Sequence, residues 1–216
     1  VAPLMRQDSS LRLVCDKDLF DYADIVVPRG QEAPVVTAIL DHLDSLDWKA
    51  LDLQPVLANS CVLGHLVPQA QERGWQVAIS QEDVSPRLEL PSSWDEYLNL
   101  LDKKQRHELR RKIRRLHEGN DILFYATDGK ENLERDLADF FRMFTASRQD
   151  KAEFMTQERA SFFKSICHAM AHKGYLKLFF LEVNGTRVAV CLCFDFQGQL
   201  YLYNSGYDPG YSSLSV

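Results

Sequence analysis

Residues 175–208 read YLKLFFLEVNGTRVAVCLCFDFQGQLYLYNSGYD, and this stretch decides the fold. It holds three apolar runs, at 175–183, 187–196 and 199–208. Asn184-Gly185 separates the first two runs, and Asn-Gly is the strongest short signal for a hairpin turn. Gln197-Gly198 separates the second and third. The pattern predicts an antiparallel meander of three strands.

Two helices are expected to precede this meander. Residues 121–126 read as a strand, and residues 131–148 and 156–174 as helices. The first helix carries one apolar face at helical spacing: Leu133, Leu137, Phe140, Phe141 and Phe144. Such a face indicates core packing, so the second half of the chain is expected to run β-α-α-β-β-β.

The first ninety residues alternate between strand and helix signals. Strands are expected at 11–15, 49–56, 75–79 and 87–90, and helices at 34–46 and from a Ser60 cap to about Arg73. Pro68 is expected to kink or shorten the second helix. The whole chain therefore indicates a mixed α/β fold.

Between these halves lies LPSSWDEYLNLLDKKQRHELRRKIRRLHEGN, residues 90–120. Ser92 or Ser93 is a good N-cap, and an apolar stripe runs from Trp94 to Leu116. We expect one helix of about 25 residues, roughly 37 Å long at 1.5 Å per residue. Residues 103–115 hold eight basic side chains and one acid, so this segment carries +7 and the remainder of the chain −13. Any binding of a polyanion must therefore be local.

The five cysteines are odd in number and form no CxxC pair. This usage favours a reducing compartment without a disulfide framework. No apolar run approaches the roughly 20 residues of a transmembrane helix. We expect a cytoplasmic protein, either free or at the inner membrane surface. The chain opens on Val1, which favours a fragment of a longer protein.

The order of elements and two motif regions resemble a known family. The family's Trp-x-x-Tyr-Leu start, basic run and Leu-x-x-x-Gly end correspond to Trp94, Tyr97, Leu98, Lys103, Lys104, Arg106, Glu108, Leu109, Arg110, Arg111, Lys112, Leu116 and Gly119. Residues 178–216 resemble its strand pair and its Tyr-x-x-Gly-Tyr-Asp-Pro strand end. The chain thus resembles the CelD-like acetyltransferases of the GNAT superfamily, relatives of the Fem peptidoglycan-bridge aminoacyltransferases.

This resemblance implies two GNAT-like halves, both incomplete, joined by a long basic helix. Residues 1–90 would be the rear part of a first domain, 91–119 the linking helix and 120–216 the front part of a second. The family's phosphate-binding helix would begin where the chain ends at Val216. We therefore expect a fragment that lacks part of its active site and can be inactive.

The implied function is that of a GNAT-type N-acyltransferase. It would move an acyl group from acetyl-CoA or another acyl-CoA to an amine or hydroxyl of a cell-envelope or polysaccharide precursor. The acceptor would be a small molecule or a lipid-linked or glycan-linked one. No metal is expected, since His168 and His172 have helical spacing but no obvious third ligand.

The candidate site lies at the end of the third strand of the meander. There a backbone N–H would polarise the thioester carbonyl. Asp208 is the candidate base and Tyr203 or Tyr207 the candidate acid. The same segment equally fits alternating aromatic strand formers followed by an Asp-Pro-Gly turn. The implied cofactor-binding residues are Tyr201, Asn204, Ser205 and Ser215, and the implied substrate-binding residues are Arg148, Arg106 and Arg110.

The basic segment leaves two alternatives open. It is either a solvated amphipathic helix or a surface for an anionic lipid, glycan or RNA. Aromatic residues for base stacking are missing between Tyr97 and Phe124, so the nucleic-acid signal is weak. Two rival functions remain: a Fem-type transferase that uses aminoacyl-tRNA, and a degenerate GNAT pair that binds without catalysis.

Overall fold

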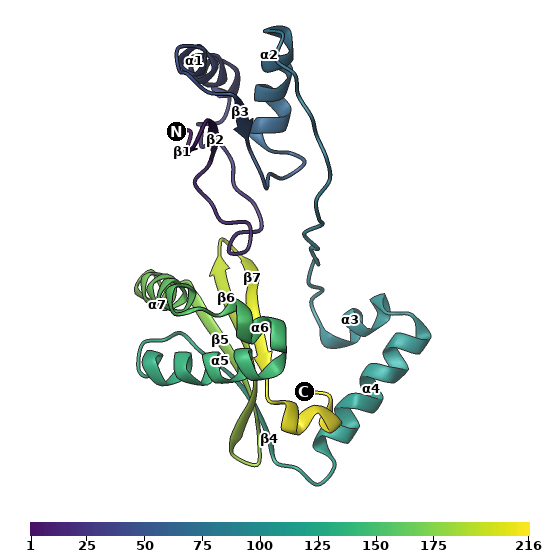
Figure 1. Cartoon of the computed structure of the whole chain (residues 1–216). Coiled ribbons are helices and arrows are strands. Elements are labelled where there is room, and N and C mark those ends of the chain that lie inside the picture. The colour runs from purple at the N-terminus through teal and green to yellow at the C-terminus, as the bar shows by residue number, and fades with distance from the viewer. The chain divides into compact units, whose positions relative to one another are not determined.

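The computed structural model describes all residues from Val1 to Val216 and divides the chain into two compact units, Val1–Glu89 and Leu90–Val216. Each unit has its own sheet, one of three strands and one of four (Figure 1). The mixed α/β fold expected from the sequence is confirmed. No helix of the chain is long and apolar enough to cross a membrane.

The first unit is built around a three-stranded sheet. The strands β1 (Leu4–Gln7) and β2 (Ser10–Leu13) form an antiparallel hairpin, and β3 (Ala50–Asp52) pairs in parallel with β2. Its helical elements are α1 (Glu32–Asp44), the π-helical turn η1 (Val62–Leu66) and α2 (Val67–Glu72). Pro68 lies in the first turn of α2, directly after the π-helical turn, where its missing N–H leaves the regular α-helical bond unmade.

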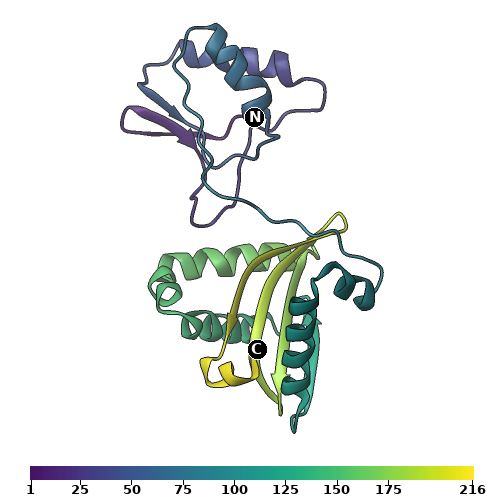
Figure 2. The same ribbon diagram turned by 90° about the vertical axis from the view of Figure 1, so that its right-hand side faces the viewer.

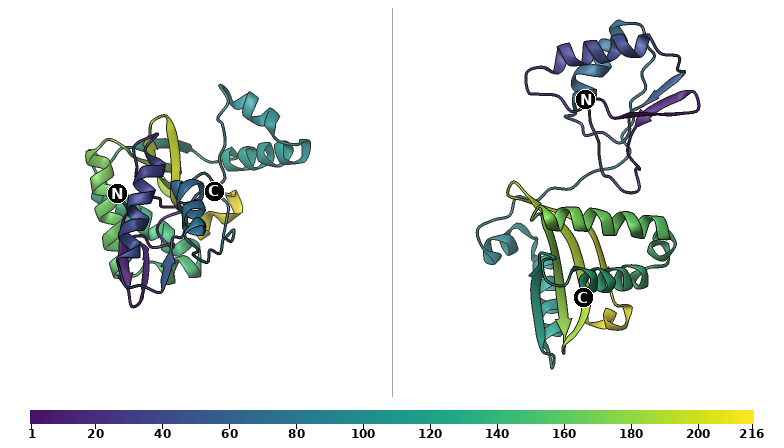
Figure 3. Two further views of the ribbon diagram at one scale, coloured as in Figure 1. Left: turned by 90° about the horizontal axis from the view of Figure 1, so that it is seen from above. Right: turned by 90° about the vertical axis from the view of Figure 1, so that its left-hand side faces the viewer.

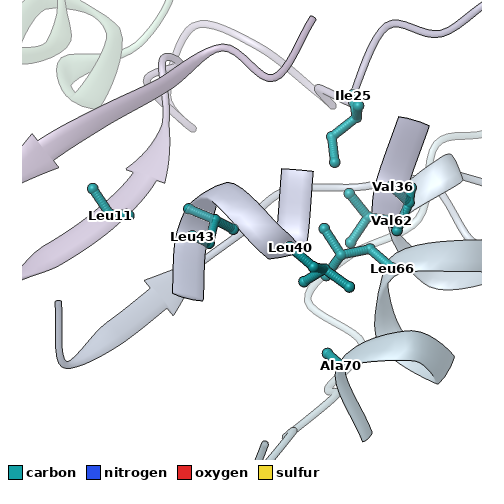
Figure 4. Packing of buried hydrophobic residues seen from close by; sticks show 8 residues of the cluster. All are labelled: Leu11, Ile25, Val36, Leu40, Leu43, Val62, Leu66 and Ala70. Atoms are coloured by element: carbon teal, nitrogen blue, oxygen red, sulfur yellow. The ribbon is translucent and has the colours of Figure 1, made fainter. Parts of the chain in front are cut away.

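The core of the first unit comes from both helical segments and the sheet. Figure 4 shows Val36, Leu40 and Leu43 of α1 among residues of η1 and α2. Trp48 and Trp75 meet edge to face at 4.9 Å beside this core. This apolar packing fixes the unit without any contribution from a disulfide, since all five cysteines are free thiols.

Two expected strands of the first half are absent. Residues 75–79 and 87–90 have no regular secondary structure. Trp75 and Val77 pack their side chains against the core, but no strand is available to pair with their backbone. Residues 78–90 are exposed throughout, and an extended segment without a paired strand does not form a sheet. The predicted strands at 75–79 and 87–90 were therefore wrong.

The expected long helix is two helices. α3 (Trp94–Leu100) is capped by Ser93, whose Oγ accepts from the Glu96 N–H at 3.2 Å. α4 (Lys103–His117) starts afresh at Asp102, which forms a capping box with Gln105. Leu101 between them is extended. The Asp102 side chain accepts a hydrogen bond from the first turn of α4. This capping favours a new helix start at Asp102 over a helix that continues from α3.

The second unit has a four-stranded antiparallel sheet in the order β4-β5-β6-β7. The strands are β4 (Ile122–Thr127), β5 (Leu176–Val183), β6 (Thr186–Phe196) and β7 (Gln199–Tyr207). Asn184 and Gln197 both take positive φ ahead of their glycines, so both predicted hairpin turns are confirmed. A short 3₁₀-helix, η2 (Pro209–Leu214), follows β7.

Helices cover one face of this sheet and α4 lies on the other side. The covering helices are α5 (Leu133–Ser147) and α7 (Gln157–His172), with the short α6 (Gln149–Phe154) between them. Figure 2 and the right panel of Figure 3 show them across the sheet from α4. Phe140, Phe144 and Phe163 form the aromatic centre of the core. No residue of α4 is fully buried, so its apolar stripe is only half covered.

Candidate functional site

The strand β7 is an edge of its sheet, because only β6 pairs with it. The Asp208 N–H donates to the Val188 carbonyl at 2.8 Å, and the register continues with Val190 opposite Gly206. In an antiparallel pair, bonded and non-bonded positions alternate. The backbone groups of Ser205 and Tyr207 therefore point away from β6, toward the free edge.

A register shift marks the middle of β7. Leu192 faces Asn204 and Cys193 faces Leu202, so Tyr203 is an extra residue on β7. Such a bulge bends the strand and changes the direction of the groups beside it. The edge from Tyr203 to Asp208 is thus an irregular strand end with no further strand beside it, which a ligand can join as an added strand.

Lys151 of α6 reaches this edge. Its Nζ donates to the Ser205 carbonyl at 2.5 Å and lies 4.8 Å from the centroid of the Phe144 ring. Burial lowers the pKa of the Lys151 ammonium, and the charge of Arg148 acts in the same direction. Asp150 and Cys191 act in the opposite direction. Lys151 is therefore a half-buried amine at the predicted site.

The candidate base Asp208 caps η2. Its Oδ1 accepts from the Gly210 N–H at 2.9 Å, and its Oδ2 lies 3.5 Å from the Arg142 guanidinium. Arg142 also donates to the Arg187 carbonyl at 3.2 Å. These contacts hold the carboxylate at the end of β7, next to the first residues of β6.

A buried ion-pair network continues from Arg142 into the core. Arg187 Nη1 lies 2.7 Å from Asp136 and 2.9 Å from Asp139, and its Nε donates to the Tyr125 hydroxyl at 2.8 Å. The Tyr125 hydroxyl in turn donates to Glu182 at 2.5 Å. Burial alone would lower the pKa of Arg187, but its bonds to Tyr125, Asp136 and Asp139 outweigh burial and raise the pKa. The network thus keeps a charged arginine in the core.

The two candidate acids lie on opposite faces of β7. The Tyr203 ring packs against Phe163 and Phe194, each at 5.2 Å between centroids, on the face covered by helices. Tyr207 faces Ala189 in the register, two residues from Ser205 and on the other face. The structure therefore brings Tyr207 to the face shared with Ser205 and Cys191, and turns the Tyr203 ring toward the aromatic core.

The predicted cofactor-binding residues are spread along the strand and beyond it. Tyr201 is exposed and its hydroxyl donates to Gln199. Asn204 Oδ1 accepts from the Ser205 N–H at 3.3 Å. Ser215 takes positive φ after η2, and its hydroxyl contacts Arg115 of α4. The Nε of Arg115 is buried without a hydrogen-bond partner.

Two of the three predicted substrate-binding arginines have their partners in helical segments and not on β7. Arg148 is exposed between α5 and α6, and it forms a bidentate pair with Asp150. Arg106 donates to Asn99 and to the Leu101 carbonyl, so it closes the break between α3 and α4. Arg110 is exposed on α4.

The side chains that surround the strand end are mostly ones that the sequence did not single out. Lys151 and Arg142 approach it from α6 and α5, and Arg115 of α4 contacts Ser215, which follows η2. Arg142 stands three residues after Asp139, a spacing that signals a helix-face pair. Lys151 and Arg115 carry no such signal, because their partners lie 54 and 100 residues away.

The two histidines of α7 form no cluster with other metal-ligand side chains, and no group of three or more such residues has the geometry to hold a metal ion. His168 Nε2 lies 2.7 Å from the Glu134 carboxylate at the surface, with both side chains more than half exposed. This contact joins α7 to α5.

One comparison with known proteins gives a match. The family model described as acetyltransferase (GNAT) domain matches residues 103–216, which is more than half of the chain. The matched region begins with α4 and includes β7, η2 and the helices α5, α6 and α7. No curated protein matches the chain.

Proposed function

Because the chain belongs to the family of GNAT acetyltransferase domains, we propose that it transfers an acyl group from acyl-CoA to a cell-envelope or polysaccharide precursor. The acceptor group is an amine or a hydroxyl. The precursor class, the CelD-like subtype and the likeness to Fem enzymes derive from the resemblance of residues 90–120 and 178–216.

The free edge of β7 carries this proposal. Ser205 and Tyr207 direct their backbone N–H and C=O groups away from β6. The amide groups of a pantetheine arm pair with such an edge as an added strand does. An outward N–H of the edge is then available to the thioester oxygen, where it stabilises the negative charge that develops during transfer.

Asp208 is the proposed base. Its carboxylate is anchored by the Gly210 N–H and faced by Arg142, and it is the acid that directly follows the β7 edge. It accepts the proton that the acceptor amine or hydroxyl loses as the new bond forms. Tyr207, on the same face as Ser205, is the proposed acid for the leaving thiolate.

Donor binding is tested by amide hydrogen exchange with and without acetyl-CoA. We expect slower exchange at Tyr203–Asp208 and unchanged exchange in β4, which lies at the opposite edge of the sheet. Isothermal calorimetry measures the heat of the same binding. Absence of both heat and protection would refute the use of acyl-CoA and leave the rival of a binding module without catalysis.

Asp208→Asn separates binding from chemistry, because the amide oxygen still accepts from the Gly210 N–H. With an amino-sugar and polyol panel as acceptors, release of free CoA thiol should fall by about 10²-fold to 10⁴-fold, the usual contribution of general base catalysis. Protection of Tyr203–Asp208 by acetyl-CoA should be unchanged. A variant with full activity would exclude Asp208 as the base.

We also propose that the basic face of α4 binds an anionic partner. Six of the eight basic residues in this region are exposed: Lys103, Lys104, Arg110, Arg111, Lys112 and Arg114. Vesicles containing an anionic lipid should bind the protein, and Arg110→Gln/Arg114→Gln should weaken this binding. If tRNA competes strongly and with a steep salt dependence, the aminoacyl-tRNA rival is favoured instead.

A further inference from the structure

The Lys151 side chain holds an unusual position for a surface-helix lysine. Its Nζ lies over the Phe144 ring, 4.8 Å from the centroid, and donates a hydrogen bond to the Ser205 carbonyl on the edge of β7. This carbonyl borders the outward backbone groups of Tyr207, with which a donor's amide would pair. The amine therefore lies directly beside the path that we assign to the acyl donor.

We propose that Lys151 is a site of covalent self-acylation, which takes the acyl group of an acyl-CoA bound along β7. The proposal rests on the proposed function, since it needs the donor to bind at that edge. It adds a modification that is separate from transfer to an external acceptor.

The reaction balances without any further reagent. The neutral Lys151 amine attacks the thioester carbonyl carbon, and the C–N bond forms as the C–S bond breaks. The electron pair of the C–S bond leaves on the CoA sulfur, and the proton lost from nitrogen neutralises that thiolate. The products are an amide on Nζ and free CoA. Because an amide is stable, the product is a lasting modification and not an intermediate of turnover.

Two features of the environment favour this lysine over the others. Burial, with Arg148 nearby, lowers the pKa of its ammonium, so more of it is in the neutral nucleophilic form. The bond to Ser205 and the contact with Phe144 hold the amine in one place, and a held nucleophile reacts far faster than a freely moving one. Lys164 of α7 is exposed, and its Nζ lies 6.0 Å from the Phe141 centroid.

The consequence of modification is local. The amide keeps one N–H, which can still donate to the Ser205 carbonyl. Burial raises the pKa of the neighbouring Cys191 thiol, and acylation removes the Lys151 charge that partly opposes this rise. Acylation would therefore change the charge beside the β7 edge while the contact between α6 and β7 persists.

The experiment compares the protein with three variants after incubation with acetyl-CoA, using intact mass and peptide mapping. We expect one acetyl group per chain, located on Lys151. Lys151→Arg should lose this modification, because arginine keeps the charge but is not acylated. Lys164→Arg, the matched control, should retain it. Gly64→Ala, in the first unit, controls for substitution as such.

A second arm measures donor binding alone. A CoA thioether ketone, in which a methylene stands between the sulfur and the carbonyl carbon, binds without a leaving group, and hydrogen exchange at Tyr203–Asp208 reports its binding. Protection by this analogue, together with no acetyl group on Lys151 after incubation with acetyl-CoA, would overturn self-acylation and leave the proposed function standing. Acetylation spread equally over Lys164 and other surface lysines would overturn it as well. Absence of protection would overturn both proposals.

Discussion

Arg187 is the side chain on which most polar contacts of the second unit converge. Its side chain is 13% exposed and that of Asp136 only 3%. The guanidinium lies 3.9 Å from the Phe180 centroid, so its plane covers an aromatic ring while its edges donate to Asp136, Asp139 and Tyr125. A charge buried in this way is stable only while its partners remain.

Arg187→Met should therefore destabilise the second unit by about 3–5 kcal/mol, because it leaves the buried Asp136 carboxylate without a counter-charge. Urea unfolding, followed by far-ultraviolet circular dichroism, measures the loss of stability. Arg187→Met/Asp136→Leu removes both charges and should recover part of it. A double variant as unstable as the sum of its two single variants would show that the pair is not coupled.

Asp24 has a structural role that also depends on one carboxylate. Its oxygens accept from the N–H groups of Cys61 at 2.7 Å and Val62 at 3.2 Å, which start η1. The sequence predicted Ser60 to cap this helix. Ser60 Oγ does accept from the Leu63 N–H at 3.1 Å, so both residues cap the same helix start.

Asp24→Ala should cost the first unit about 1–2 kcal/mol, the range for loss of an N-cap side chain. Asp24→Asn keeps an oxygen acceptor and should cost less. Thermal unfolding of both variants gives the comparison. Equal losses would mean that the negative charge, and not the hydrogen bond, stabilises the helix start.

Among the elements, those with local signals were predicted best. The turns at Asn184-Gly185 and Gln197-Gly198 fix their own hairpins, so β5, β6 and β7 follow from short-range patterns. The free edge of β7 and the bulge at Tyr203 depend on which strands pair, and no local pattern encodes that. The break at Leu101 was missed because the apolar stripe continues across it, whereas the Asp102 capping box favours a new helix.

The approach of α5 to β7 requires a glycine at position 206. A Cβ on Gly206 would lie 2.4 Å from the Phe144 backbone nitrogen and 2.6 Å from its Cα. Backbone atoms cannot rotate out of the way, so the helix and the strand would have to separate. This contact also sets the position of the neighbouring Ser205 relative to α6.

Gly206→Ala should destabilise the second unit by at least about 1–3 kcal/mol, the usual cost of overpacking a core. It should also weaken donor protection of Tyr203–Asp208, because β7 is displaced. Gly64→Ala is the control: a Cβ there meets nothing within 4 Å, and alanine favours helix, so stability should be unchanged or slightly higher. A fully stable Gly206→Ala would contradict the close packing of α5 on β7.

Across the chain, burial orders the reactivity of four of the five thiols. Burial raises the pKa of Cys167 and of Cys193 to about 12. Burial also raises the pKa of Cys15 and Cys61, but these two are only half buried and remain accessible. The reacting species is the thiolate, and a raised pKa means less thiolate at a given pH.

Iodoacetamide at pH 8 should therefore label Cys15 and Cys61 first and leave Cys167 and Cys193 unlabelled in the folded protein. Raising the pH to 9 should speed labelling of the first two, since it increases their thiolate fraction. Mass mapping of the labelled peptides measures the order. Early labelling of Cys167 would mean that α7 detaches from the sheet in solution.

The segment that joins the two units should be the first site of proteolysis. Residues 78–90 are exposed and have no regular secondary structure, and Arg87 within them has only the exposed Glu89 as its ionic partner. A protease needs an extended, accessible backbone. The basic residues of α4 are also exposed, but their backbone is held in helical hydrogen bonds behind the Asp102 capping box.

Brief trypsin treatment should therefore cut first after Arg87 and yield two fragments that remain folded, because each unit has its own core. Mass spectrometry identifies the first cut, and circular dichroism of the separated fragments reports their structure. Arg87→Gln should slow this cut. First cuts within α4 would show instead that the α4 backbone unfolds locally and is cleaved faster than residues 78–90.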